Sequence, residues 1–429
     1  MRIGLEVHVA LPTKTKLFCG CSTEGDEPNT AICPTCLGFP GSKLMLNEDA
    51  LSASLRVAKA LHCQINEITY FLRKVYFYPD LPKSYQITQL EGAVGHDGYV
   101  DLGRKRIRIR RVQLEEDPAK IIREEEYSLL DFNRSGIPLD EIVTEPDIET
   151  EDDLREFVSE LRSILYYAGV DIDKEMKVDL NISLGNERVE VKNVTGIKNL
   201  IDAERFEVKR QSNLIASGQM IAKETRSYNS EMLSTVSSRE KESDEEYGFI
   251  YEPDLSAYPT LKDSIPDTVI ASSAARQLSS KYGINEVTLK ELVMFDRNAL
   301  RLIQHGLRCS KAGTVINAIE LLKRHNGIMI SDKGFEKMLS YMDNGMLLNE
   351  DAIKALLEDR DIGAEKNAVS AEEIDNAIRD IVSSRQDLVN EYKSNSKAFN
   401  FIVGMVLKKY KVSPKYISER LAEFLKDKA

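Results

Sequence analysis

Two polar residues that share one face of a strand are the first that can do chemistry. The run from Ile3 to Leu11 alternates apolar and polar side chains, which predicts a β-strand, and its polar positions include Glu6 and His8. Side chains two positions apart on a strand point to the same side. A carboxylate beside an imidazole can bind a divalent metal ion, orient a ligand or carry a proton. The sequence therefore predicts a functional pair on this strand.

More carboxylates follow later strand-like runs. Mg²⁺ suits such oxygen ligands, because it keeps several waters and takes one or two carboxylates together with substrate phosphates. We expect some of these acids to join Glu6 and His8 at a magnesium site, although any one acid at a strand end is more often simply solvated. The acids concerned are Glu115, Glu116 and Asp117, then Asp140 and Glu141, and then Glu145 and Asp147.

Four cysteines form two closely spaced pairs. Eleven residues separate Cys19-x-Cys21 from Cys33-x-x-Cys36. Soft thiolates in a closed set of four select Zn²⁺ in tetrahedral geometry. The alternative is four free or buried thiols, or a redox pair. A zinc ion with four cysteine ligands has no open position, so this zinc would be structural and the chemistry would lie elsewhere.

Arginines alternate along a basic run that precedes the first group of acids. Arg104, Arg106, Arg108 and Arg110 share one parity, which predicts a strand with one cationic face. Such a face suits phosphate or an acidic partner, and it equally suits an edge strand that is protected by charge. The alternation shifts at Arg110-Arg111, where we expect a β-bulge.

The size and charge of the chain limit what these residues can belong to. With 429 residues, two or three domains are expected, and a net charge of −12 disfavours indiscriminate nucleic-acid binding. No apolar run is long enough to span a membrane and the chain begins directly with a strand, so we expect a cytoplasmic protein. The sequence lacks the phosphate-binding loop, the dinucleotide fingerprint and the nucleophile elbow, so any use of ATP needs another scaffold.

The elements that position the candidate residues change character along the chain. The first half alternates short strands with turn signals, and helical periodicity dominates from about residue 267. A second break near 358–370 separates a helical middle from a helical tail. Within the first half we expect a hairpin turn at Asp97-Gly98, a helix over 150–168, strands over 177–184 and 188–194, a helix over 202–224 and a surface loop over 229–247.

Motifs spread along the whole chain match those of one protein family. They are Ile3-Gly4-Leu5-Glu6-Val7-His8, Glu27-Pro28-Asn29-Thr30, Tyr76-Phe77-Tyr78-Pro79-Asp80-Leu81-Pro82-Lys83, Tyr85-Gln86-Ile87-Thr88-Gln89, Glu115-Glu116-Asp117, Asp131-Phe132-Asn133-Arg134-Ser135-Gly136, Glu145-Pro146-Asp147-Ile148, Asp179-Leu180-Asn181-Ile182-Ser183, Val191-Lys192-Asn193 and Asn395-Ser396-Lys397-Ala398. In these motifs and in their order, the chain resembles the B subunit of the aspartyl/glutamyl-tRNA(Asn/Gln) amidotransferases.

The resemblance implies an α+β, multidomain fold. In that family a cradle domain of mixed sheet and helices, similar to glutamine synthetase, is followed by an all-α helical domain and a small helical tail. The expected domains here are a catalytic cradle over 1–260 with a zinc knuckle at 19–36, a helical domain over 261–365 and a tRNA-binding tail over 366–429. A basic patch in the tail suits tRNA, and it is equally typical of a solvated helix; it comprises Lys408, Lys409, Lys411 and Lys415.

The resemblance also implies an activity, cofactors and partners. The B subunit uses ATP and Mg²⁺ to phosphorylate the side-chain carboxylate of mischarged Glu-tRNA(Gln) or Asp-tRNA(Asn), and ammonia released from glutamine by the A subunit displaces the phosphate. The chain is thus expected to act as a carbon–nitrogen ligase with ATP, Mg²⁺ and structural Zn²⁺. The expected partners are an amidase-type A subunit, a small C subunit and the mischarged tRNA, with no membrane involved.

Roles for single residues follow from the same resemblance. Glu6, His8 and Glu116 match positions at the Mg²⁺ and phosphoryl-transfer site, and Glu141 is expected to be a further catalytic member. Positioning and charge neutralisation by the metal, rather than covalent chemistry of the protein, would then supply most of the rate. The residues expected to bind the cofactor are Glu115, Lys83, Asp179, Asn181 and Lys192, and the expected zinc ligands are Cys19, Cys21, Cys33 and Cys36.

Three other functions remain open. A non-catalytic tRNA-binding adaptor would keep the knuckle and the tail without the chemistry, and a stand-alone ligase of small carboxylates would leave the helical half without a purpose. The archaeal E subunit, a paralogue that acts on Glu-tRNA(Gln), carries a large insertion before its helical domain. Only about ten residues separate Leu255 from the first expected helix here, so the B subunit is preferred.

Overall fold

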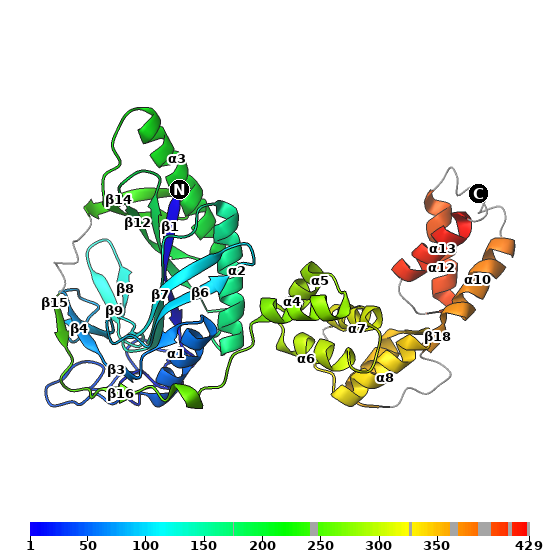
Figure 1. Cartoon of the computed structure of the whole chain (residues 1–429), viewed down its shortest axis with the longest axis horizontal. Coiled ribbons are helices and arrows are strands. Elements are labelled where there is room, and N and C mark those ends of the chain that lie inside the picture. Colours follow the sequence, from blue (N-terminus) through cyan, green and yellow to red (C-terminus); the bar gives the residue numbers. More distant parts are fainter. Residues whose placement is uncertain are drawn as a thin grey trace. The chain divides into compact units, whose positions relative to one another are not determined.

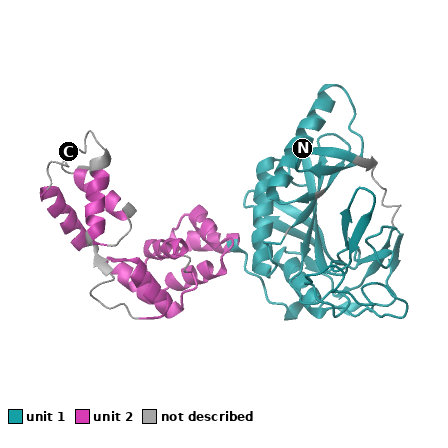
Figure 2. Cartoon of the chain, turned by 180° about the vertical axis from the view of Figure 1, so that it is seen from behind, with its two compact units in different colours: residues 1–271 teal, residues 272–429 magenta. Residues whose placement is uncertain are grey.

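A computed structural model of the chain describes residues 1–174, 176–240, 248–325, 328–360, 368–384, 396–410 and 414–426. The chain forms two compact units, Met1–Ala271 and Ser272–Ala429 (Figure 2). The first unit mixes sheet and helix, and the second consists mainly of helices, which confirms the α+β, multidomain expectation. The likeness to glutamine synthetase and the expected boundaries at residues 260 and 365 stay predictions.

A nine-stranded sheet organises the first unit. Its order is β14-β13-β12-β11-β1-β10-β7-β6-β2, so β1 (Arg2–Ala10) lies in the middle, between β11 and β10. Neighbouring strands pair antiparallel, except for the parallel pair of β12 and β13. The other strands are β2 (Gln64–Ile65), β6 (Gly95–Asp101), β7 (Arg106–Glu116), β10 (Pro138–Thr144), β11 (Lys177–Ser183), β12 (Val189–Thr195), β13 (Glu224–Asn229) and β14 (Ser234–Glu240).

Three helices pack against this sheet and line one side of it (Figure 1). The helix expected over 150–168 is confirmed: its N-cap Thr150 accepts a backbone hydrogen bond from the first turn. At its other end Gly169 has φ 99°, the left-handed conformation that commonly ends a helix. The three helices are α1 (Glu48–Ala60), α2 (Glu151–Ala168) and α3 (Ile197–Ala216).

Strand β1 divides its residues between the core and the open face of the sheet. The apolar positions alternating from Ile3 to Val9 lie in the core with residues of the helices, and each is at most 5% exposed. Burial of such side chains contributes roughly 1.5–3 kcal/mol apiece. The intervening Glu6 and His8 are half-buried on the opposite face. The strand expected here and the shared face of Glu6 and His8 are therefore confirmed.

A small three-stranded sheet meets the end of β7. In it β4 (Leu72–Val75) pairs with both β5 (Tyr85–Thr88) and β15 (Gly248–Tyr251). Gln86 Nε2 donates to the Glu116 carbonyl at 2.8 Å, so β5 runs beside the last residues of β7, which β6 no longer covers. The remaining strands of the first unit are β3 (Ile68–Thr69), β8 (Lys120–Arg123), β9 (Ser128–Asp131) and β16 (Tyr258–Pro259).

Helices make up most of the second unit, as the periodicity predicts. Two short strands, β17 (Met346–Leu348) and β18 (Ala368–Ser370), pair with each other, and the last three helices share a hydrophobic core that includes Ile374 and Leu421. None of the helices in the described parts of the chain is long and apolar enough to cross a membrane. The helices are α4 (Ala271–Tyr282), α5 (Glu286–Val293), α6 (Arg297–Gly306), α7 (Ala312–Arg324), α8 (Asp332–Asp343), α9 (Glu350–Leu357), α10 (Ala371–Ser384), α12 (Ser396–Lys409) and α13 (Pro414–Lys426).

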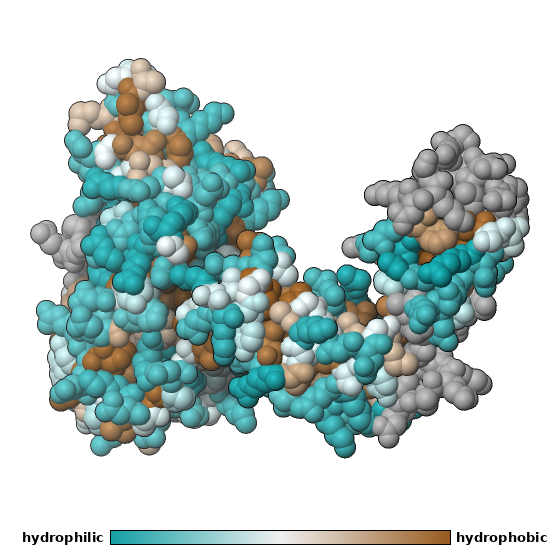
Figure 3. All heavy atoms as spheres, turned by 45° about the vertical axis from the view of Figure 1, so that its right-hand side comes forward, coloured by the Kyte–Doolittle hydropathy of each residue, from teal (hydrophilic) through white to brown (hydrophobic). Residues whose placement is uncertain are grey.

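The surface of the first unit is largely hydrophilic but has an apolar end. Figure 3 shows apolar atoms gathered at the end of this unit where α3 terminates. Ile215 and Met220, at and after the end of α3, are 50% and 89% exposed. Exposed apolar side chains that cluster in this way are typical of surfaces that contact another molecule.

The hairpin expected at Asp97-Gly98 is wrong, because both residues lie inside β6. The chain instead reverses between β6 and β7, where the Leu102 N–H donates to the Lys105 carbonyl at 3.0 Å. A Cβ at position 98 would lie 2.5 Å from the Leu61 carbonyl oxygen. Glycine at this position therefore serves the close approach of β6 to the turn after α1, rather than a hairpin turn.

Two expectations near the end of the sheet also need correction. The helix expected over 202–224 runs over Ile197–Ala216, since Gly218, with φ 72°, ends it early. Part of the loop expected over 229–247 is strand β14, which pairs with β13; residues 241–247 lie outside the described residues. Pairing with a neighbouring strand, and not the polarity of the residues, holds this segment extended.

Candidate active site

The register of β1 with its two neighbours gathers acids on the open face of the sheet. His8 lies directly opposite Glu141 on β10, and Glu6 lies opposite Asp179 on β11. Directly opposed residues of an antiparallel pair point to the same face and stand about 4.5–5.5 Å apart at Cβ. The alternation in β1 therefore predicts the face, and pairing with β10 and β11 adds the carboxylates.

His8 stands between two buried carboxylates. Its Nε2 atom lies 3.5 Å from Glu115 Oε1 and 4.0 Å from Glu141 Oε2. Gln113 Nε2 donates to Glu141 at 2.6 Å, and Thr88 Oγ1 donates to Glu115 at 2.9 Å, so both acids are held in place. Burial alone would lower the pKa of His8, but the charges of Glu141 and Glu115 outweigh it and raise that pKa.

Glu6 belongs to a second, adjacent group. Glu6, Asp179 and Glu190 each bring a carboxylate oxygen within 4.8 Å of the others. Lys192 Nζ lies 2.9 Å from Asp179 Oδ2 and 3.1 Å from Glu190 Oε1, and Asn181 Nδ2 donates to Glu6 Oε1 at 3.1 Å. Burial, followed by the charges of Glu141 and Asp179, raises the pKa of Glu6.

The composition of these two groups fits a hard divalent cation. Five carboxylates and one imidazole converge from five adjacent strands. Lys192 lies between two of these acids, and the charges of Lys74 and Arg111 act on Glu141. Negative charges held together without enough cations either take up protons or bind metal ions. Because all but one of the donors are carboxylate oxygens, the set suits Mg²⁺ better than a soft metal.

Glu116 is not part of either acidic group, contrary to expectation. Its carboxylate accepts from Lys83 Nζ at 2.6 Å and from the Ile87 N–H at 2.9 Å. The side chains of Lys83 and Glu116 are only 5% and 7% exposed, and they line a small pocket together with Cys19 and Lys16 near the cysteine cluster. Successive residues of a strand point to opposite faces, so Glu115, and not Glu116, stands beside His8.

Most of the expected cofactor-binding residues do come together. Asp179, Asn181 and Lys192 lie around Glu6, and Glu115 lies beside His8, whereas Lys83 is engaged by Glu116. Sequence reasoning missed Glu190. Its position two residues before Lys192, in an alternating run, is the signal that would have found it.

Two arginines of the cationic face of β7 are neutralised by the protein's own acids. Arg108 pairs with Asp147 at 2.6 Å, and Arg110 pairs with Glu145 at 2.8 Å. Because β7 is hydrogen-bonded on both sides, by β6 and β10, the edge-strand interpretation is wrong. The expected bulge at Arg110 is confirmed: the register with β10 shifts between the partners of Arg111 and Ile109.

The four cysteines form one group whose chemistry fits zinc. Their sulfur atoms lie within 4.8 Å of one another, as a shared metal ion requires. A hydrogen bond from Cys19 lowers the pKa of Cys36 to about 4 against the effect of burial, and the charge of Lys16 acts in the same direction. Lys16 is fully buried, with its Nζ 3.7 Å from Cys36 Sγ. The hydrogen bond to Cys36 and burial raise the pKa of Cys19, and burial raises the pKa of Cys21, so binding of a metal ion as four thiolates would release protons from this pair.

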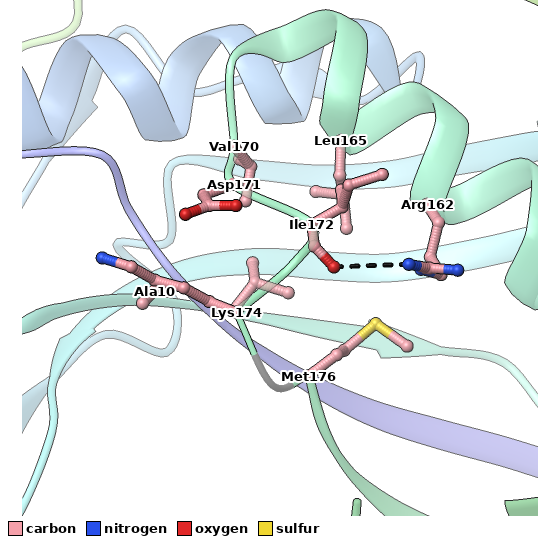
Figure 4. Close-up of a pocket in the computed structure, with 9 residues that line it drawn as sticks. Ala10, Arg162, Leu165, Val170, Asp171, Ile172, Lys174 and Met176 are labelled. Atoms are coloured by element: carbon pink, nitrogen blue, oxygen red, sulfur yellow. Dashed lines mark hydrogen bonds between the residues drawn. The ribbon is translucent and has the colours of Figure 1, made fainter. Parts of the chain in front are cut away.

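A separate pocket near the start of β11 lacks such groups. Arg162 Nη2 donates to the Ile172 carbonyl at 3.3 Å at its edge, and most of the other lining side chains are apolar (Figure 4). No residue of the acidic groups lines this pocket. Its charged lining residues are Arg162, Asp171 and Lys174, which form no cluster of acids, so the chemistry is assigned to the open face of the sheet.

The basic patch expected in the tail is only partly described. Lys408, on α12, is exposed. Lys411 and Asn395 lie outside the described residues, and so do the side chains of Lys409, Lys415 and Asn193. A role of this patch in tRNA binding stays a prediction.

The amino-acid sequence matches two family models and many known proteins. Residues 1–265 match the GatB/GatE catalytic domain, and residues 301–425 match the GatB domain. Proteins named as the B subunit of aspartyl/glutamyl-tRNA(Asn/Gln) amidotransferase match over almost their whole length. The one from Sulfurisphaera tokodaii is 36% identical over 99% of both chains, and the one from Saccharolobus solfataricus is 37% identical over 95% of both. The one from Methanoregula boonei is 37% identical over 99% of this chain and 98% of its own.

These matches agree with the site described above. The first family model covers more than half of the chain and includes each strand that contributes to the acidic groups. The second covers most of the helical unit. The chain therefore belongs to the family of aspartyl/glutamyl-tRNA(Asn/Gln) amidotransferase B subunits.

Proposed function

We propose that the chain uses ATP to activate the side-chain carboxylate of mischarged Glu-tRNA(Gln), Asp-tRNA(Asn) or both, as the B subunit of a glutamine-dependent amidotransferase. The observation that carries this proposal is the convergence of His8, Glu115 and Glu141 with Glu6, Asp179 and Glu190 on one face of five adjacent strands. The names of relatives that match along nearly their whole length support the same reaction.

Activation joins two anionic groups, because the terminal phosphoryl group of ATP moves to a carboxylate oxygen. Mg²⁺ bound by the two acidic groups would neutralise the phosphate oxygens. The protein holds these ligands before substrate arrives: Lys192 bridges Asp179 and Glu190, and Gln113 fixes Glu141. Ligands that are already positioned need no reorganisation during the reaction, which lowers its barrier.

Amidation follows when ammonia attacks the activated carbonyl carbon. A carbon–nitrogen bond forms, the bond from carbon to the phosphate oxygen breaks, and a proton must leave the nitrogen. A carboxylate of the acidic groups that does not bind the metal ion would accept this proton.

The same proposal includes cofactors and partners. The four cysteines would bind a structural Zn²⁺, an amidase-type A subunit would supply ammonia from glutamine, and a small C subunit would complete the complex. The exposed apolar end of α3 offers a surface for a protein partner, and the basic tail with Lys408 offers one for tRNA. We also infer a cytoplasmic location and a glutamine-synthetase-like cradle for the first unit.

A non-catalytic tRNA-binding adaptor is the second candidate. Clustering buried acids costs stability unless a cation binds them, so an adaptor would have no reason to keep them. The intact acidic groups therefore favour the enzyme. The absence of ATP hydrolysis that depends on mischarged tRNA would favour the adaptor.

An amidation assay tests the proposed function. The full chain receives ATP, Mg²⁺, glutamine and either mischarged tRNA, with and without an added amidase-type subunit. We expect ATP-dependent amidation of at least one tRNA. Glu115→Gln should lower the rate at least about a hundredfold by weakening the metal site, with tRNA binding nearly unchanged. Glu156→Gln, a matched change on α2, should keep the rate, and wild-type protein that amidates neither tRNA would reject the proposal.

A further inference from the structure

Strand β13 lies directly beside the part of β12 that carries Glu190. The two strands pair in parallel, and their register places Thr225 next to Glu190. Neighbouring residues of paired strands point to the same face of a sheet. Thr225 therefore brings a hydroxyl group to the acidic group that contains Glu190, although it contributes no carboxylate to that group.

The hydroxyl of Thr225 holds one oxygen of the Glu190 carboxylate. Thr225 Oγ1 donates to Glu190 Oε2 at 3.2 Å, while Lys192 Nζ lies 3.1 Å from Glu190 Oε1. Both hydrogen-bonded residues are buried, because only 3% of Thr225 and 5% of Glu190 is exposed. A carboxylate that is held at one oxygen can still rotate about its terminal bond, and a second contact stops this rotation. The contacts of Thr225 and Lys192 together fix the orientation of Glu190.

The strand that carries Thr225 is itself anchored to α3. Arg226, the next residue, pairs with Glu207 of α3 at 3.1 Å and with Glu224 at 3.0 Å. Its Nη2 atom also donates to the Thr235 carbonyl of β14 at 2.8 Å. The side chain of Glu207 has no exposed surface and that of Arg226 is 12% exposed. Buried networks of charge-assisted hydrogen bonds make their surroundings rigid, so the hydroxyl of Thr225 has a fixed place beside β12.

We propose that Thr225 is a positioning residue, whose hydroxyl keeps the Glu190 carboxylate in the orientation that binds a divalent cation. The inference rests on the proposed function, in which the group of Glu6, Asp179 and Glu190 binds Mg²⁺. Replacing a residue that hydrogen-bonds a metal ligand commonly lowers metal affinity by roughly 10–100-fold. Thr225 acts through Glu190, so its effect must disappear when Glu190 is removed.

Titration of the full chain with Mn²⁺, followed by the electron paramagnetic resonance signal of free Mn²⁺, tests this role without an activity assay. Mn²⁺ takes the same oxygen ligands as Mg²⁺. Glu190→Ala identifies the site to follow, because the affinity of that site falls. Thr225→Val and Thr225→Ala both remove the hydroxyl, and each should weaken this site about tenfold. Thr225→Ser keeps the hydroxyl and should bind Mn²⁺ within about threefold of the wild type.

Thr260→Val is the matched control. Thr260 is 2% exposed, its Oγ1 donates to the Asn66 carbonyl at 2.6 Å, and it belongs to neither acidic group. The substitution removes a buried hydrogen bond here too, so it should lower stability but change Mn²⁺ affinity by less than about twofold. In a Glu190→Ala background, Thr225→Val should change the remaining affinity by less than about twofold. Circular dichroism of each variant confirms that it is folded.

The outcomes separate this role from the proposed function. If a folded variant without the hydroxyl binds Mn²⁺ within about twofold of the wild type, the positioning role is wrong while the proposed function stands. Thr225→Ser that binds as weakly as Thr225→Val would also reject the role, since the hydroxyl would then not be the cause. An equal loss in the Glu190→Ala background would show that Thr225 does not act through Glu190. Wild-type protein that binds no Mn²⁺ contradicts both proposals.

Discussion

At the residue scale, a buried lysine tells most about the cysteine group. Lys16 has no exposed surface, and its ammonium lies 3.7 Å from Cys36 Sγ and donates to the Phe132 carbonyl at 3.2 Å. Glu116, which lines the same small pocket, is paired with Lys83. An ammonium removed from water requires an anionic neighbour. Four neutral thiols would not supply one, whereas four thiolates on a divalent metal carry a net charge of about −2. The lysine therefore favours the metal-bound interpretation of the cysteines.

Lys16→Met removes this charge while keeping most of the volume of the side chain. Without the ammonium, the thiolates should bind the metal less tightly. We expect the concentration of a competing chelator that removes half of the zinc to fall at least about tenfold. Lys14→Met, an exposed change two residues away, should have no effect. Zinc content and chelator competition, followed spectroscopically, measure this without any activity assay. Unchanged zinc retention in Lys16→Met would contradict the role of the lysine.

The composition of the site was only partly predictable from single residues. The face shared by Glu6 and His8 follows from alternation alone, and it is confirmed. Whether Glu115 or Glu116 joins them depends on the parity of β7, which the bulge at Arg110 shifts, and on pairing with β10. Both depend on contacts between strands far apart in the sequence, so adjacent acids cannot be told apart before the register is known.

At the element scale, the close approach of β6 to the end of α1 has a measurable cost. Gly98→Ala would bring a Cβ to 2.5 Å from both the Leu61 carbonyl oxygen and Cys63 Sγ, so backbone must move. We expect a loss of about 2–3 kcal/mol in the free energy of unfolding, in the range of overpacking substitutions. Urea denaturation followed by circular dichroism measures it.

The helix α7 offers the control for this substitution. No atom lies within 4 Å of a Cβ built at Gly313, so Gly313→Ala should be neutral or stabilise by up to about 1 kcal/mol. If Gly98→Ala and Gly313→Ala changed the free energy of unfolding equally, the contact with Leu61 would not be the reason for glycine in β6.

Elements stabilised by interactions among their own residues could be predicted from the sequence, and elements stabilised by contacts with distant segments could not. Thr150 and the acids after it identify α2 because capping is a local interaction. The polar composition of β14 predicts a loop. Its extended form could not be predicted, because it depends on hydrogen bonds to β13. The dipeptide Asp97-Gly98 has the composition of a turn, yet the glycine serves a contact with a distant segment.

At the scale of the whole molecule, the two units have separate hydrophobic cores. The core of the first unit includes residues of β1, α1, α2 and α3, and the last three helices of the second share another. Domains with separate cores commonly unfold separately. We expect the full chain to unfold in two urea-induced transitions. Only the transition in which the circular-dichroism signal of the β-strands is lost should persist in a chain truncated after residue 271. A single transition in the full chain would contradict this expectation.

The central place of β1 also constrains synthesis on the ribosome. The Leu5 N–H donates to Thr144 Oγ1 across 139 positions of the chain, and β11, the other neighbour of β1, comes later still. Strand β1 therefore leaves the exit tunnel well before β10 and β11 and waits without these partners while much of the domain is translated. Such distant pairing is slow to form, and during this interval the apolar face of the nascent strand is exposed to aggregation.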